Sequence, residues 1–181
     1  MARLAFLISL LSLTAFAGTS CKKVNKLVQF NLDYKTEITV PASAGVNLPF
    51  NLFTPNVETN SEASFKANDT RKDLVDEIML TELRMTIKSP ANGDFSFLES
   101  VKVFISAPNV EEKEVAAMNS VPANIGSVLS LETLGADLAP YLKADRFTLK
   151  VRTTTDELLS EDYKIEVYSD FHVIAKLINA D

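Results

Sequence analysis

Apolar and polar residues alternate one by one along much of this chain. The alternation is clearest over 28–35, 82–88, 147–152 and 164–177, where apolar side chains occupy almost every second position. Successive side chains of a β-strand point to opposite faces, so a period of two gathers the apolar residues on one face. The pattern predicts antiparallel strands that are buried on one side.

Shorter apolar runs predict the remaining strands. One covers 101–106 and follows the turn signal Asn92-Gly93-Asp94, and weaker candidates cover 37–40, 48–53, 114–121 and 127–131. The span 163–178 would extend about 50 Å as one straight strand, at about 3.3 Å per residue. We therefore expect a bend or bulge near Ser169 and Asp170, where the chain would cross between sheets.

Two short helices interrupt the strand pattern. Asp69 or Thr70 can cap a helical turn that runs through Asp73 to about Ile78, because these side chains accept hydrogen bonds from the first free N–H groups of a helix. The second predicted helix covers 137–142. Both are too short to change the fold class.

Eight or so strands separated by turn signals predict a single all-β domain. We expect an antiparallel two-sheet β-sandwich of immunoglobulin-like type over 27–181. A lipocalin-like β-barrel is the alternative, since both closures use the same alternation. The expected core contains Phe30, Leu83, Ile87, Val103, Leu149, Val151, Val167 and Phe171.

The first 20 residues have the composition of a secretory signal peptide. Arg3 precedes an apolar stretch over 4–17, and small residues follow at 18–20. The stretch is shorter than the roughly 20 residues that a membrane-spanning helix needs. A core helix of this length would show a polar face, whereas 4–16 contains no charged residue.

Cys21 is the single cysteine of the chain and follows the small residues directly. The segment Gly18-Thr19-Ser20-Cys21 resembles the relaxed lipobox of Bacteroidetes lipoproteins. The resemblance implies cleavage before Cys21, acylation of its sulfur, and residues 21–26 as a lipidated tether. Surface-displayed lipoproteins of this group carry acidic residues after the cysteine, but here Lys22, Lys23 and Lys26 follow. We therefore expect an outer-membrane anchor that faces the periplasm.

Composition narrows the classes of partner and chemistry. The chain has 18 basic and 24 acidic residues, a net charge of −6, which argues against a nucleic-acid partner. A single cysteine cannot form an internal disulfide, and acylation would explain both its position and its isolation. We expect a membrane partner through Cys21, an envelope protein as a further partner, and no cofactor.

Candidate chemistry in the domain is sparse. Asp170 and His172 share one strand face, and we expect a solvated cross-strand pair rather than metal ligands, since no further ligand has recognisable spacing. The acidic runs 111–114 and 156–162 lack the D-x-[DN]-x-[DN]-G spacing of a calcium loop. Tyr168 and Tyr141 are the candidates for sugar stacking in a chain without tryptophan.

These observations lead to one functional hypothesis and one alternative. The leading hypothesis is a non-enzymatic binding or scaffolding module that its lipid holds at the cell envelope. The alternative is a periplasmic carrier of a small apolar ligand or lipid, because apolar strand faces that close into a barrel enclose a cavity. We find no nucleophile elbow such as G-x-S-x-G, so an enzyme is the third choice.

Overall fold

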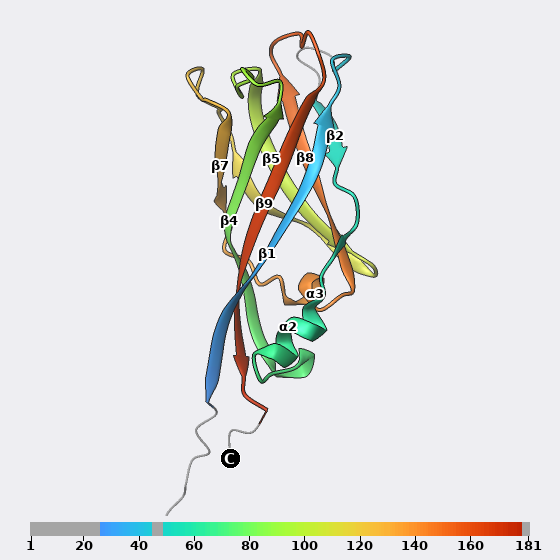
Figure 1. Ribbon diagram of the computed structural model, residues 1–181, viewed down its shortest axis with the longest axis vertical. Coiled ribbons are helices and arrows are strands. Elements are labelled where there is room, and N and C mark those ends of the chain that lie inside the picture. Colours follow the sequence, from blue (N-terminus) through green and yellow to red (C-terminus); the bar gives the residue numbers. More distant parts are fainter. Residues whose placement is uncertain (1–25, 45–48, 179–181) are drawn as a thin grey trace, which may run out of the picture.

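The computed structural model describes residues 26–44 and 49–178, which form a mostly antiparallel β-structure with short helical pieces (Figure 1). The predicted signal peptide and Cys21 lie outside the described residues. The elements are, in chain order, β1 (Leu27–Val40), β2 (Pro49–Phe53), β3 (Val57–Glu58), α2 (Ser61–Ala67), the 3₁₀ turn η1 (Lys72–Leu74), β4 (Val75–Ser89), β5 (Leu98–Ala107), β6 (Val110–Met118), β7 (Val128–Thr133), α3 (Ala139–Leu142), β8 (Arg146–Thr155) and β9 (Tyr163–Lys176). The all-β prediction is confirmed.

The strands join into one curled antiparallel sheet. Within the described residues its order is β1-β9-β4-β7-β6-β5-β8-β2, and β3 pairs with β8 outside this path. The link between the two halves is short, because β6 and β7 pair only through Ala116 with Thr133 and Ala117 with Glu132. β1 and β2 stand at opposite ends of this order and yet lie near each other, so the sheet curls back on itself.

The predicted alternation is observed, and it sorts the side chains between core and solvent. All the expected core residues are buried except Phe30, which is half-buried and meets the buried ring of Phe65 edge-on at 6.2 Å. Aromatic rings fill much of the interior, since Phe147 and Phe171 lie 5.9 Å apart and each also contacts Tyr34. The core is therefore packed with side chains from both halves of the sheet.

The bend or bulge that we expected near Ser169 and Asp170 does not lie in the last strand. β9 runs unbroken over 14 residues and pairs along its length with β1 on one side and β4 on the other. The extra residue lies in the partner strand: Leu80 pairs with Phe171 and Glu82 with Asp170, which leaves Thr81 as a β-bulge in β4. A bulge lets two long strands stay paired while they twist.

The two helix predictions fare differently. Residues 139–142 form α3, inside the predicted range. The predicted turn ending at Ile78 is reduced to η1, and β4 begins at Val75. The seven-residue helix α2, just before it, was not predicted. Among the described residues no helix is long and apolar enough to cross a membrane.

The pairing of β1 with β9 brings the first and last described residues to one end of the molecule. Leu27 is opposite Lys176, and the Leu177 N–H donates to the Lys26 carbonyl at 3.0 Å. The Ile178 N–H donates to the carbonyl of Asp69, next to α2. β1 ends at the opposite end, where the connections after β4, β6 and β8 also lie, as Figure 1 shows.

Candidate functional site

The predicted pair Asp170 and His172 lies on the outer face of the sheet and takes part in a network across three strands. Asn31 of β1 stands between them: its amide donates to Asp170 Oδ2 at 2.8 Å, and its Oδ1 lies 2.9 Å from His172 Nδ1. Thr81, the bulge residue of β4, donates to the same Asp170 oxygen at 3.0 Å. An amide oxygen can only accept, so this contact places the proton on Nδ1. His172 is half-exposed.

The carboxylates of the acidic runs 111–114 and 156–162 contact different partners. Glu112 pairs with Lys150, and Glu114 pairs with Lys102 at 3.4 Å. Asp162 accepts the Ala42 N–H at 2.8 Å. Over the residues that the structure describes, no group of three or more His, Cys, Asp or Glu side chains is placed to hold a metal ion. The ion pairs are partly exposed and therefore contribute little to stability.

The two tyrosines that we considered for sugar stacking are already in contact with the protein. Tyr141 is buried, and its hydroxyl donates to the carbonyl of Glu111 at 2.6 Å, so the expectation that it is exposed is wrong. Tyr168 is half-exposed on the outer face, with the Arg84 guanidinium 5.0 Å and the Lys35 ammonium 5.9 Å from its ring centre. These two cations occupy the faces that a sugar would need.

A hollow of about 430 Å³ beside α2 is lined by hydroxyl, amide, carboxylate and ammonium groups. Thr59 lines the hollow and is fixed by two hydrogen bonds. Its hydroxyl donates to the Ala144 carbonyl at 2.7 Å, and its backbone N–H donates to the Asp145 carbonyl at 2.9 Å. The Ser61 N–H points back at the same Thr59 oxygen at 3.4 Å. Asn60, between them, has a φ of 46°, a left-handed conformation that asparagine tolerates.

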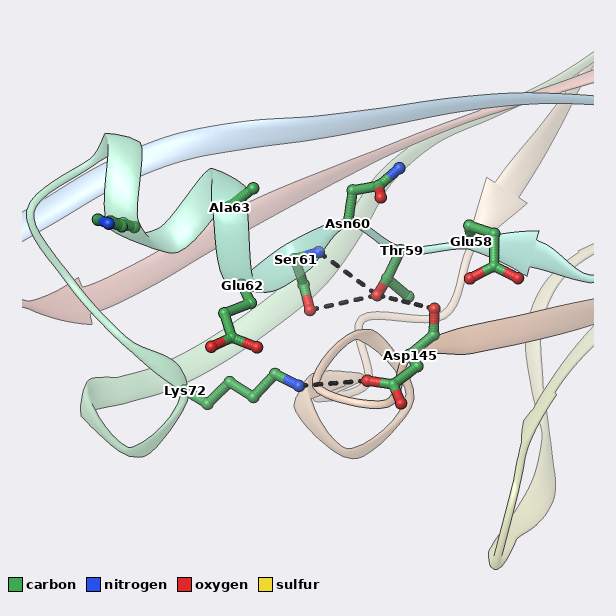
Figure 2. A pocket seen from close by; sticks show the side chains of 9 residues that line it. Glu58, Thr59, Asn60, Ser61, Glu62, Ala63, Lys72 and Asp145 are labelled. Carbon is green, nitrogen blue, oxygen red and sulfur yellow. Dashed lines mark hydrogen bonds and ion pairs between the residues drawn. The ribbon is translucent and has the colours of Figure 1, made fainter.

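Charged side chains of both signs line this hollow, as Figure 2 shows. Lys72 reaches Asp145 across it, with 3.5 Å between Nζ and Oδ1, and Glu62 of α2 lies beside them. The Asp145 side chain is 92% exposed, so this ion pair is solvated and weak. The buried Thr59 hydroxyl lies within hydrogen-bond distance of two backbone carbonyls and, at 3.2 Å, of the buried Ser61 hydroxyl. The arrangement fixes the chain around α2 and can bind polar groups.

Two further hollows adjoin α2. One, of about 460 Å³, is lined by the apolar side chains of Phe65 and Ile178 and by Lys66, Arg71 and Lys72, among others. The other, of about 300 Å³, lies between β1 and the segment 58–64. The helix is therefore surrounded by indentations of the surface at the end of the molecule where the described chain begins and ends.

Tyr34 closes the gap between β1 and the segment that leads to α2. Its hydroxyl donates to the Thr59 carbonyl at 2.8 Å, and its ring meets Phe147 edge-on at 5.2 Å. Burial, and to a lesser degree the neighbouring carboxylate of Asp33, strongly raises the pKa of Tyr34. The phenol therefore stays neutral and keeps donating to Thr59 throughout the physiological range.

Sequence reasoning missed the residues around α2. Their side chains come from 58–62, from the turn at Lys72 and from Asp145, three segments without alternation. The usable signal was Asn60-Ser61-Glu62, a polar start with an acidic residue in the first turn.

The comparisons with known proteins add no assignment. The sequence matches no family model, and no curated protein matches it. A solved structure described as Desmodium yellow mottle tymovirus is 9% identical to this chain, and the alignment covers 84% of this chain and 91% of the other, with a TM-score of 0.24. A likeness at this TM-score carries no argument about fold or function.

Proposed function

We propose that this chain is a lipoprotein of the cell envelope whose domain acts as a non-enzymatic binding or scaffolding module. Its anchor is Cys21, acylated after cleavage of residues 1–20, in the outer membrane on the periplasmic side. The observation that carries the proposal is the pairing of β1 with β9. This pairing supports a tether at one end of the domain, with the connections after β4, β6 and β8 at the other.

The geometry fits a module that displays loops away from a membrane. β1 spans 14 residues, which corresponds to about 45 Å at about 3.3 Å per residue. The connections after β4, β6 and β8 would then project into the periplasm, available to an envelope protein. The packed core also supports this reading, because its apolar strand faces are occupied by each other's side chains.

The alternative, a carrier of a small apolar ligand or lipid, draws on a different observation. The 460 Å³ hollow beside α2 has the volume of a small-ligand site and an apolar part formed by Phe65 and Ile178. A carrier would use this surface hollow rather than the packed interior.

We also infer an immunoglobulin-like sandwich as the finer description of the fold. What supports it is the short link through β7, which divides the sheet into a layer of β1, β9 and β4 and a layer of β6, β5, β8 and β2. A lipocalin-like barrel would need a hydrogen-bonded ladder between β1 and β2. The N–H groups of β1 that point away from β9 would bond to β2 in a barrel, so slow amide exchange at these groups would favour the barrel.

Two measurements test the function. Replacing Cys21 by Ala should release the domain from envelope membranes or leave the precursor uncut, and unchanged fractionation with normal processing would refute the anchor. Gentle extraction of the lipidated protein, followed by mass spectrometry, should recover a protein partner. A stoichiometric lipid beyond the anchor, with no protein partner, would favour the carrier.

A further inference from the structure

The end of the molecule that carries α2 combines features that suit a bilayer surface. Two large apolar side chains are exposed there: Leu27 is 53% and Ile178 is 44% exposed. Leu27 is the first residue of β1, and Ile178, just after β9, lines the 460 Å³ hollow. Apolar side chains beside basic ones are the composition with which proteins lie on an anionic membrane surface.

The cations at this end are placed around the hollow. Lys66 and Arg71 are exposed, and Lys72 is half-exposed. Arg71 pairs with Asp73 at 2.8 Å, and Lys72 pairs with Asp145 at 3.5 Å, so both are partly neutralised. Lys66 extends from the last turn of α2, and the tether adds Lys22, Lys23 and Lys26 in the sequence. Glu62 and Asp73 also line the hollow, so its three cations outnumber its carboxylates by one. The stems of these cations are apolar and can lie along an apolar surface.

The opposite end carries carboxylates around Tyr163. Burial, and then the carboxylates of Asp94, Glu161 and Glu157, raise the pKa of Tyr163 at the start of β9. These three carboxylates therefore lie near Tyr163, in the loops at the far end. An anionic bilayer repels carboxylates.

The tether restricts how far the domain can stand from its anchor. Five residue steps lead from Cys21 to Lys26, the first described residue. A fully extended chain spans at most about 3.6 Å per residue, which allows roughly 18 Å. An anchored Cys21 thus keeps Leu27 and the α2 end within reach of the lipid headgroups, whatever path the tether takes.

We propose that the α2 end docks on the bilayer and that the hollow lined by Phe65, Ile178, Lys66, Arg71 and Lys72 receives the headgroup of an anionic phospholipid. The inference rests on the proposed anchor at Cys21 and adds the orientation of the domain and a lipid contact of its own. The basic side chains contact the phosphate, and Leu27 and Ile178 contact the acyl boundary. The far loops then face away from the membrane.

The test uses the lipidated protein, purified in detergent and reconstituted into vesicles of phosphatidylcholine with or without phosphatidylglycerol. Acylation blocks the sulfur of the only native cysteine, so an introduced cysteine takes the single dye. Ala67→Cys places a dye at the exposed end of α2, and Leu158→Cys places one at the far end, where the native side chain is 78% exposed. A nitroxide attached to the headgroups of a tracer lipid quenches a dye that lies at the membrane surface.

We expect strong quenching at position 67 in the anionic vesicles, weaker quenching in pure phosphatidylcholine or high salt, and none at position 158. Adding Lys66→Gln should weaken docking about fivefold, the effect of one cation near an anionic surface, whereas the matched change Lys164→Gln at the far end should have no effect. Equal quenching at both positions, none at either, or quenching only at 158 would overturn the inference.

Two other outcomes separate this inference from its premises. Two dyes per chain would show a free Cys21 thiol and overturn the anchor together with the docking. One dye per chain without quenching at position 67 would leave the anchor intact and overturn the docking alone. Shielding of position 67 from a water-soluble quencher in native envelopes, but not in protein-free vesicles, would assign this end to a protein partner and also overturn the inference.

Discussion

Gly93 is the position where the fold depends most directly on the absence of a side chain. A Cβ built there would lie 2.8 Å from Tyr163 Cε1, 3.1 Å from Ile87 Cγ2 and 3.2 Å from Pro90 Cγ. The Tyr163 ring has no easy way to yield, because it packs edge-on against buried Phe97 with 4.8 Å between ring centres. Gly93→Ala therefore overpacks the turn that joins β4 to β5.

The expected size of the effect follows from two opposed terms. Forcing one extra methyl into a packed site costs about 1–3 kcal/mol, and replacing glycine returns about 0.4–1 kcal/mol by restricting the unfolded chain. We expect Gly93→Ala to lower the free energy of unfolding by roughly 1–2 kcal/mol, or Tm by about 2–8 °C for a domain of this size. Urea unfolding followed by circular dichroism measures the change.

Gly126 supplies the matched control. A Cβ there would meet nothing within 4 Å, so Gly126→Ala should be neutral or stabilise the protein slightly. If Gly93→Ala proves as stable as Gly126→Ala, the packing of Tyr163 over the turn is not as described, and the reasoning fails.

Three further changes have definite expected outcomes. Phe171→Ala, at a side chain that is 1% exposed, should cost about 3–5 kcal/mol in urea unfolding, and a loss below 1 kcal/mol would contradict its place in the core. Burial raises the pKa of Tyr34, so its contribution to stability should be full below about pH 10 and should be lost as pH rises through the raised pKa. Tyr34→Phe should reduce this loss of stability at alkaline pH. An unchanged dependence of stability on pH in the variant would contradict the burial of the phenol. His172→Ala should change stability by less than about 1 kcal/mol and release no metal in elemental analysis, because among the described residues the ring is within hydrogen-bond distance of Asn31 alone; metal lost with the histidine would be the contrary result.

The buried face of each strand could be predicted from the sequence, because the polarity of a residue indicates whether its side chain lies in the core or in solvent. Leu149 and Val151 of β8, or Val167 and Phe171 of β9, alternate with polar residues and lie in the core as expected. Periodicity carries no information on which strand lies beside which. The pairing of Leu27 with Lys176 joins residues from the two ends of the chain, and no local pattern specifies it.

The helix predicted from the capping residues Asp69, Thr70 and Asp73 does not extend to Ile78, and the apolar pattern there fits a helix as well as a bulged strand. Val75 and Ile78 are both buried and three residues apart, the spacing of one helix face. In the structure a register shift between Val75 and Glu77 inserts an extra residue into β4, so both apolar side chains face the core from a strand. The bulge at Thr81 repeats this spacing between Leu80 and Leu83. A bulged strand thus imitates a helix in its apolar pattern.

The hollow beside α2 depends on a register that only the folded chain defines. Val57 pairs with Phe147 and Glu58 with Arg146, which brings Thr59 to the carbonyls of Ala144 and Asp145. A slip of one residue would turn the Thr59 side chain to the other face and break these hydrogen bonds, since the side-chain period of a strand is two. Ser61 and the start of α2 would move with it. The candidate site is therefore a consequence of a two-residue strand pairing, and its polar residues acquire a shared location only when β3 finds β8.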